Sequence, residues 1–211
     1  MGLRIDYYAS LNSPWTHLGG GRLLDVAARC GATVRIHPVD FAAVFPASGG
    51  LPLPKRSPQR QAYRLQELAR WRDFLDVPIR LQPKHFPATE APAAHCVLAV
   101  RETIGDRPAI DLAHRVLKAL WEEDADTGDE ATLGRLIDEV GLDGPGVLRH
   151  AGDERWAALR SGETTAAVDR GVFGAPIYAV GEELFWGQDR LDFLERHLVS
   201  LADPAEPGCS G

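Results

Sequence analysis

The sequence has few cysteines and no pair of them close together. Cys30, Cys96 and Cys209 are widely separated among 211 residues, so there is no Cys-x-x-Cys motif and no disulfide framework. Thiol–disulfide exchange needs an attacking thiolate and a resolving thiol. The chain is therefore not expected to be a disulfide oxidoreductase by that route, and its cysteine usage fits a reducing cytoplasm.

An excess of basic residues and a long apolar run are also missing. The formal net charge is −7, whereas nucleic-acid binders usually concentrate positive charge on one face. The first residues become polar at once and lack the apolar stretch of a secretory signal, and no segment has the length of a membrane span. We expect a soluble cytoplasmic protein that binds neither nucleic acid nor membrane.

Several familiar catalytic motifs are absent as well. The glycines at 19–21 are not followed by the third glycine of a dinucleotide fingerprint, and no GxxxxGK phosphate loop or GxSxG elbow occurs. The seven histidines show no HExxH or Cys-rich spacing, so no metal site is expected.

The N-terminal residues predict a strand, a helix and a second strand. Apolar and polar residues alternate over 3–8, the pattern of a strand, and Ser13-Pro14 then opens a helical stretch that Gly31 ends. Val34 and Ile36 indicate the second strand. The chain thus begins with a βαβ unit.

The middle of the chain is predicted to be mainly helical. Residues 45–58 are rich in Pro, Gly and Ser and indicate an exposed loop, after which Ser57 and Pro58 are suited to begin a helix. Further helices are expected near 93–103, 109–123, 130–140 and 164–170.

The C-terminal part predicts a hairpin and a last helix. Apolar runs on either side of Gly181 indicate two short strands, and Leu191, Leu194, Leu198 and Leu201 keep a helical spacing. Residues 204–211 are expected to be disordered. The whole pattern is an α/β, thioredoxin-like domain over residues 1–203, with a helical insertion over about 57–170.

The motif Ser13-Pro14-Trp15-Thr16 lies where the first strand meets the first helix, the place of Cys-Pro-x-Cys in redox proteins of this fold. Together with the segments 171–176 and 183–191, which read GVFGAP and ELFWGQDRL, it resembles the 2-hydroxychromene-2-carboxylate isomerase family and the related kappa-class glutathione transferases. The resemblance spans nearly the whole chain and includes the DsbA-like arrangement of the fold.

The resemblance implies glutathione as cofactor and Ser13 as the catalytic residue. A hydroxyl at a helix N-terminus can donate to a thiolate and, with the helix dipole, lower the pKa of the sulfur. Ser13 alone could equally be an ordinary helix cap, and both roles can coexist. Ala175 and Pro176, with an expected cis bond, would pair with the backbone of the cofactor.

The resemblance also implies further binding residues. Gln188 and Asp189 open the last helix and would receive the γ-glutamyl carboxylate and ammonium, although Asp189 could be a simple cap. Lys55 would pair with a cofactor or substrate carboxylate, unless it is only solvated. Trp15 would shape the substrate pocket or pack in the core. Thr89 stands where the isomerases have asparagine, which puts the identity of the substrate in question.

Three functions remain open on these residues. The first is a glutathione-dependent isomerase of aromatic catabolism that acts on an aromatic-derived carboxylate by reversible thiolate addition. The second is a kappa-like glutathione transferase, whose product would retain glutathione. The third is a non-catalytic thioredoxin-like binding protein. A homodimer is expected from the resemblance.

Overall fold

A four-stranded sheet forms the centre of the molecule. The computed structural model describes residues 2–202, with strands β1 (Arg4–Tyr8), β2 (Thr33–His37), β3 (Ile177–Val180) and β4 (Glu183–Trp186) in the order β2-β1-β3-β4. β1 pairs with β2 in parallel and with β3 in antiparallel direction, and β3 and β4 form the predicted hairpin. The N-terminal βαβ unit is confirmed.

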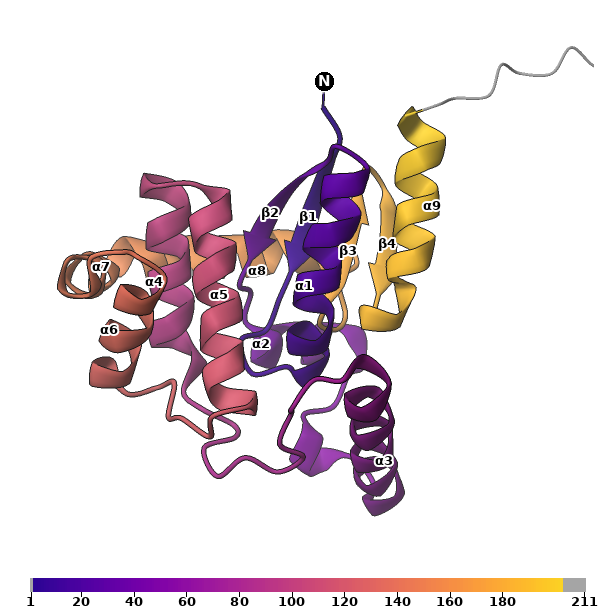
Figure 1. Cartoon of the computed structure of the whole chain (residues 1–211), viewed down its shortest axis with the longest axis horizontal. Helices are drawn as coiled ribbons and strands as arrows, with labels where there is room; N and C mark the ends of the chain where they lie inside the picture. Colours follow the sequence, from indigo (N-terminus) through magenta and orange to yellow (C-terminus); the bar gives the residue numbers. More distant parts are fainter. Residues whose placement is uncertain (1, 203–211) are drawn as a thin grey trace, which may run out of the picture.

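Helices surround this sheet (Figure 1). In chain order the helical elements are α1 (Pro14–Arg29), α2 (Phe41–Ser48), the 3₁₀ turn η1 (Leu53–Lys55), α3 (Pro58–Leu75), α4 (Glu90–Thr103), α5 (Asp106–Trp121), α6 (Glu130–Glu139), α7 (Gly144–Ala151), α8 (Glu154–Asp169), the 3₁₀ turn η2 (Gln188–Arg190) and α9 (Leu191–Ala202). The helices α3 to α8 lie between β2 and β3 in the sequence. The boundaries of the insertion at about 57 and 170 stay a prediction.

The two faces of the sheet pack against different helices, because alternate residues of a strand point to opposite sides. Ile5, Tyr7 and Tyr178 share one buried cluster with residues of α1, α4, α5 and α9. Tyr8 and Ile177 face the other way, into a smaller cluster with α2 and α8. The central strands β1 and β3 are therefore covered on both faces, whereas the edge strand β4 is partly exposed.

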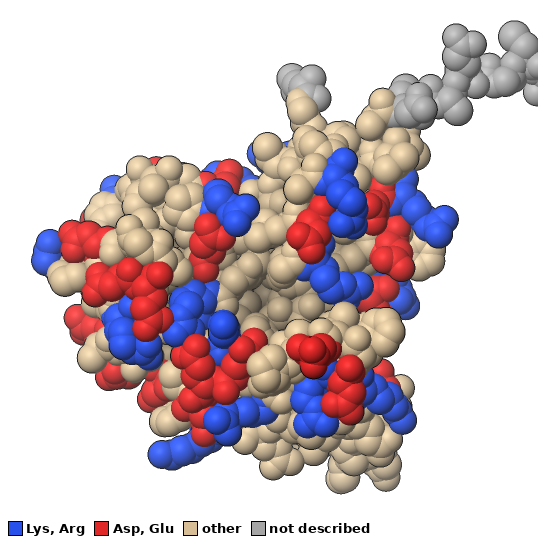
Figure 2. Space-filling view, viewed as in Figure 1, with Lys and Arg blue, Asp and Glu red and all other residues tan. Residues whose placement is uncertain are grey.

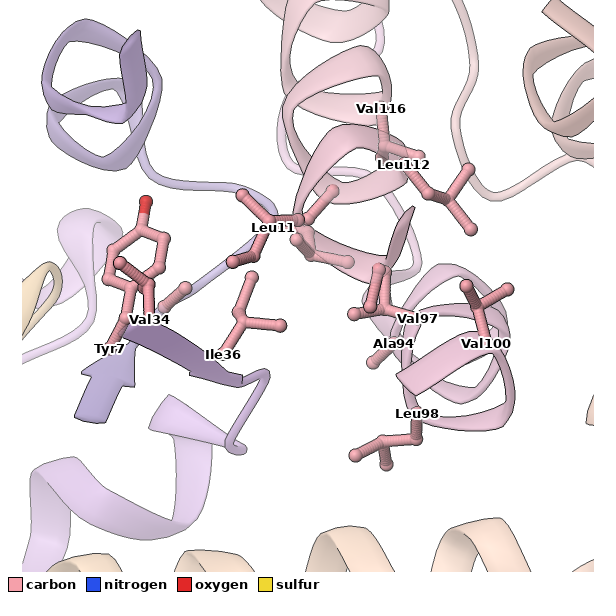
Figure 3. Packing of buried hydrophobic residues seen from close by; sticks show 14 of the residues in the cluster. Tyr7, Leu11, Val34, Ile36, Ala94, Val97, Leu98, Val100, Leu112 and Val116 are labelled. Atoms are coloured by element: carbon pink, nitrogen blue, oxygen red, sulfur yellow. The ribbon is translucent and has the colours of Figure 1, made fainter. Parts of the chain in front are cut away.

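The larger cluster joins the sheet to the helical middle of the chain. Figure 3 shows Ile36 of β2 pointing toward the pair α4 and α5, where Val97 and Leu112 belong to the same fully buried core. The helical segment is thus not an appendage but contributes a large share of the core, as a domain with one hydrophobic core requires.

Two helical segments depart from the sequence expectations. The predicted loop over 45–58 is wrong at its start, because α2 runs to Ser48: the Asp40 carboxylate accepts from the Ala42 N–H at 2.9 Å and caps the helix, and Pro46 is tolerated inside it. Helix α7 was not predicted, since it begins with Gly-Pro-Gly; there Asp143 caps and Pro145 stands in the first turn.

The other expected elements are present with shifted ends. Ser57 caps α3 as predicted. Helix α6 begins at the predicted residue, α4 and α5 begin three residues earlier than predicted, and α8 begins ten residues earlier. Gln188 and Asp189 form the 3₁₀ turn η2 rather than the first turn of the α-helix, which begins at Leu191. The expected disorder of 204–211 falls outside the described residues.

Charges of both signs are mixed over the face in Figure 2, and no extended basic surface is visible there. Across residues 2–202 no helix is long and apolar enough to cross a membrane. In the same part of the chain, no group of three His, Cys, Asp or Glu side chains is placed to hold a metal ion.

A charged network lies between the sheet and α8. The imidazole of His37 contacts Asp6 Oδ1 at 3.2 Å through Nε2 and Glu163 Oε2 at 3.1 Å through Nδ1. Arg101 donates to the Ile36 carbonyl and Glu163, and Arg170 donates to Asp6 at 2.9 Å. These contacts connect β1, β2, α4 and α8 in one set of hydrogen bonds.

Burial and pairing act in opposite directions on these groups. Burial alone would lower the pKa of His37, but its hydrogen bonds to Asp6 and Glu163 raise it above the ordinary value. Burial would raise the pKa of Glu163, yet hydrogen bonds from His37 and Arg101 hold it at about 2. His37 therefore stabilises the fold when it is protonated and both carboxylates are charged.

The contribution of His37 should depend on pH. It is complete below the unfolded pKa of about 6.5 and lost as the pH rises through the higher folded pKa. The carboxylates lose their contribution only in acid, because their folded pKa values are depressed. His37→Gln should thus lower the free energy of unfolding by about 3 kcal/mol near pH 6 and by clearly less near pH 9, measured by urea denaturation.

His85→Asn is the control, because His85 has only a 3.6 Å contact with the half-exposed Asp126. It should cost little at either pH. An equal loss at both pH values for His37→Gln would contradict a role for the protonated imidazole.

Candidate active site

The site forms where the N-terminus of α1 meets the loop before β3. Ser13 caps α1: its Oγ accepts from the Thr16 N–H at 3.2 Å and donates to the carbonyl of Ala175 at 3.4 Å. The first turn of α1 contains no acidic residue, so nothing there offsets the positive end of the helix dipole. This end of α1 favours a negatively charged group.

The loop before β3 contains the expected cis peptide bond between Ala175 and Pro176. Among residues 2–202 the N–H of Ala175 has no hydrogen-bond partner, and the carbonyl of Pro176 accepts from the Gly187 N–H at 2.9 Å. Ala175 thus presents a free backbone donor beside the Ser13 hydroxyl. A peptide can pair with such an edge in an extended conformation.

The turn η2 completes this arrangement. The buried side chain of Gln188 accepts from Arg22 Nη1 of α1 at 2.6 Å, and the Gln188 carbonyl accepts from the same nitrogen at 3.2 Å. Arg22 therefore fixes η2 against α1. Because Arg22 engages the side-chain oxygen and the carbonyl of Gln188, the donors that remain for a ligand are its amide Nε2 and backbone N–H groups of η2.

The Asp189 carboxylate lies over Gly187 at the surface. Gly187 has a φ of 100°, a backbone conformation that favours glycine, and its Cα lies against Asp189, so that a Cβ there would be 2.6 Å from Asp189 Oδ1. Asp189 contacts the exposed Arg190 at 2.7 Å. The carboxylate is accessible and lies close to Gly187, whose N–H pairs with the Pro176 carbonyl.

A second glycine allows α1 to approach the sheet. A Cβ at Gly19 would be 2.6 Å from Tyr178 Oη and 2.9 Å from Gln188 Cβ, so any larger residue would push α1 away from β3 and η2. Gly19 therefore sets the spacing between Ser13's helix and the other half of the site.

The structure brings together some of the predicted residues and not others. Ser13, Ala175, Pro176, Gln188 and Asp189 form one continuous region through the contacts described above. Lys55 is exposed at the end of η1, and no contact connects it to that region among the described residues.

Trp15 has contacts in the core, and its role in a substrate pocket stays a prediction. It packs against the apolar cluster that contains Leu68 and Trp121, and it also lines a pocket of about 400 Å³ beside α3. Thr89 is exposed at the start of α4, and its side chain makes no capping hydrogen bond.

The loop before Ser13 is held by residues on both sides of Thr89. The Asn12 amide forms a reciprocal pair with the backbone of Ala88, Nδ2 to O at 2.9 Å and N to Oδ1 at 3.0 Å. The buried Glu90 carboxylate accepts from the Leu11 N–H, and from the Ser10 hydroxyl at 3.3 Å. Burial raises the pKa of Glu90, against the opposing effect of Arg160 and these donors.

Sequence reasoning did not find Arg22, Asn12 and Glu90. Each acts over a long separation: Leu11 and Glu90 are 79 residues apart, and Arg22 and Gln188 are 166 residues apart. The only feature of the sequence that could have pointed to them is that Asn12 precedes Ser13 and that Glu90 follows Thr89, since Ser13 and Thr89 were themselves candidate site residues.

The fold and this site are those of a DsbA-like thioredoxin domain without the redox cysteines. The family model of the DSBA-like thioredoxin domain matches residues 4–199. The chain is also 30% identical over 200 residues to 2-hydroxychromene-2-carboxylate isomerase of Sphingobium xenophagum, covering 92% of this chain and 97% of that protein. The chain belongs to the 2-hydroxychromene-2-carboxylate isomerase family within the DSBA-like thioredoxin domains.

Solved structures agree with this assignment. A 2-hydroxychromene-2-carboxylate isomerase superposes with a TM-score of 0.78 and 26% identity, covering 95% of this chain and 97% of the other. The cytosolic disulfide reductase DsbM from Pseudomonas aeruginosa, determined with GSH, has a TM-score of 0.64 at 18% identity and covers 93% and 100% of the two chains. This second likeness concerns the fold.

Glu90 should be important for the order of the loop that precedes Ser13. Glu90→Ala leaves the Leu11 N–H and the Ser10 hydroxyl without their acceptor, at a cost of about 1–3 kcal/mol in the free energy of unfolding. Amide hydrogen exchange at Leu11 should become faster. Glu90→Gln, which keeps one oxygen acceptor, should lose less; unchanged exchange and stability in Glu90→Ala would refute this role.

Proposed function

We propose that the protein is a glutathione-dependent isomerase that acts on an aromatic-derived carboxylate, as its relatives' name, 2-hydroxychromene-2-carboxylate isomerase, describes for them. The observation that carries the proposal is the position of the Ser13 hydroxyl at the N-terminus of α1, 3.4 Å from the carbonyl of Ala175. The cytoplasmic location and the homodimer expected from the sequence stay predictions.

The residues present fit a glutathione molecule. The Ala175 N–H is free to pair with the cysteinyl backbone of the tripeptide. The Ser13 hydroxyl donates only through a long 3.4 Å contact, so it can redirect its proton toward the sulfur while still accepting from the Thr16 N–H. The exposed Asp189 carboxylate suits an ammonium group, and the backbone of η2 suits a carboxylate. The cysteinyl backbone, the thiol, and the ammonium and carboxylate of the γ-glutamyl group thus each have a partner of matching chemistry.

Ser13 would hold the sulfur in its charged form. A hydroxyl that donates to a thiolate stabilises the charged state, and the helix N-terminus adds to this effect, so both lower the thiol pKa. When bound, glutathione supplies a sulfur nucleophile that can add reversibly to a conjugated double bond and leave again. The rotation permitted while that bond is single would interconvert cis and trans isomers of the substrate.

The other residues would position the reactants. Arg22 holds η2, and Glu90 and Asn12 hold the loop before Ser13, so that the hydroxyl and the cis-Pro176 loop keep their relative position. Such positioning accounts for a large part of enzymatic rate acceleration. Trp15 follows Ser13 by two residues and lines a pocket beside α3, so its indole would form an aromatic wall of the substrate site.

Ser13→Ala should raise the thiol pKa of bound glutathione and lower kcat/KM by about 100-fold, as expected for loss of one donor to a reacting anion. The thiolate absorbance in the ultraviolet, followed against pH, reports the pKa. Isomer interconversion of 2-hydroxychromene-2-carboxylate reports the rate. Ser161→Ala, on the exposed surface of α8, is the control.

An unchanged thiolate pKa in Ser13→Ala would exclude this role of Ser13. A product that retains glutathione would instead identify a transferase. A protein that does not bind glutathione would show that glutathione is not its cofactor.

Asp189→Asn should weaken glutathione binding about tenfold, because a charge-assisted contact with the γ-glutamyl ammonium is replaced by a neutral one. Asp192→Asn is the matched control, since Asp192 is an exposed carboxylate at the start of α9. Calorimetric titration at neutral pH measures both. Equal affinities for the two variants would show that Asp189 does not contact the cofactor.

A further inference from the structure

The pocket beside Trp15 is unusually rich in arginine. Its volume is about 400 Å³, and it lies between the start of α1 and one face of α3, with Arg56, Arg60 and Arg64 among the lining residues. Arg60 and Arg64 are one helical turn apart on α3, so their side chains leave the helix on the same side. Tyr63 and Trp15 provide aromatic surface in the same pocket.

These three guanidinium groups are not neutralised within residues 2–202. The side chains of Arg60 and Arg64 have no hydrogen-bonding or ion-pair partner there, and Arg56 donates only to the Leu51 carbonyl at 2.8 Å. The one acidic lining residue, Glu67, pairs with Arg70. The pocket therefore has an uncompensated positive charge.

Arg64 is the most constrained member of the three. Its guanidinium is partly buried and lies over the rings of Phe86 and Trp121, 5.2 and 5.7 Å from their centroids. Burial and the neighbouring charge of Arg56 lower the pKa of Arg64 to about 10, so the group stays charged at neutral pH. A partly buried cation without an anionic partner is costly, and an anionic ligand would remove much of that cost.

Aromatic stacking fixes the direction of this group. The Arg64 guanidinium lies over the rings of Phe86 and Trp121, and cation–π contact with them holds the side chain in place. The N–H edges of a guanidinium lie in its plane and match the two oxygens of a carboxylate. The pocket thus combines the aromatic surface of Trp15 and Tyr63 with a guanidinium group that its ring contacts hold in place.

We propose that this pocket binds an aromatic substrate that carries two negative charges, and that Arg64 determines the preference for the second anionic group. The inference rests on the proposed function, because it assigns the substrate class of the same site. One negative charge would be a carboxylate that pairs with Arg56 or Arg60, and the other would be an anionic group that pairs with Arg64. A substrate with one carboxylate leaves part of the positive charge in the pocket without a partner.

The test compares two probes with the same skeleton, trans-cinnamate with one carboxylate and trans-2-carboxycinnamate with two. Calorimetric titration of the full-length protein should give at least about tenfold tighter binding of the dicarboxylate, since a charge-assisted hydrogen bond is worth about that factor or more. In Arg64→Met the ratio of the two affinities should fall to near one, whereas Arg64→Lys should retain part of it.

Arg72→Met is the matched control, because Arg72 lies on α3 outside the pocket and pairs with Asp73. It should keep the wild-type ratio. Thermal unfolding confirms that each variant is folded. Equal affinities of the wild-type protein for the two probes, or a ratio that Arg64→Met leaves unchanged, would overturn the proposal.

Repeating the titrations with S-methylglutathione bound separates this inference from the proposed function. S-methylglutathione cannot add to a double bond, so only binding is measured. If S-methylglutathione fails to bind while the protein still prefers the dicarboxylate, the cofactor assignment is wrong and the binding of two negative charges in this pocket is supported. If Arg64→Met lowers the affinity for S-methylglutathione but leaves the ratio of the two probe affinities unchanged, the pocket binds the cofactor and the proposal is overturned.

Discussion

The site depends on one contact between distant parts of the chain, in which the Ser13 hydroxyl donates to the carbonyl of Ala175. The two residues are 162 positions apart, and they meet because β1 pairs with β3 in the sheet. The pairing places the end of β1, where α1 begins, next to the start of β3, where the cis-proline loop ends. The other positioning contacts serve the same junction: Gly19 lets α1 approach β3, Arg22 fixes η2 against α1, and Glu90 holds the loop that leads to Ser13.

This junction explains how a redox fold can be used without redox chemistry. In the Cys-Pro-x-Cys arrangement the helix N-terminus stabilises a thiolate that belongs to the protein. Here the same helix end and the same proline remain, whereas the sulfur has been replaced by a hydroxyl. The physical consequence is that the environment that stabilises a thiolate is kept, and in the proposed function the thiolate comes from a ligand. The arginines on α3 add a second constraint, because they make the neighbouring pocket selective for negative charge.

The sequence predicted elements that depend on local pattern. The strand predicted over 3–8 and observed over 4–8, the Pro14 and Pro58 helix starts and the hairpin around Gly181 all follow from alternation, capping and turn residues, and the structure confirms them. Helices α2 and α7 were missed because Pro46 and Gly144 are poor helix formers, and caps from Asp40 and Asp143 outweigh them. The partners of Ser13 could be named only from the resemblance. Contacts such as Glu90 with Leu11, and the stacking of Arg64 on Phe86 and Trp121, arise from tertiary packing that leaves no periodic signal.

A crystal structure of the protein with glutathione tests the central claim most directly. The account predicts that the glutathione sulfur lies within hydrogen-bond distance of Ser13 Oγ, that the cysteinyl backbone pairs with Ala175, and that the γ-glutamyl group contacts η2 and Asp189. The Ser13 hydroxyl should then have turned from the Ala175 carbonyl toward the sulfur. Glutathione bound elsewhere, or bound at this junction with its sulfur away from Ser13, would contradict the account.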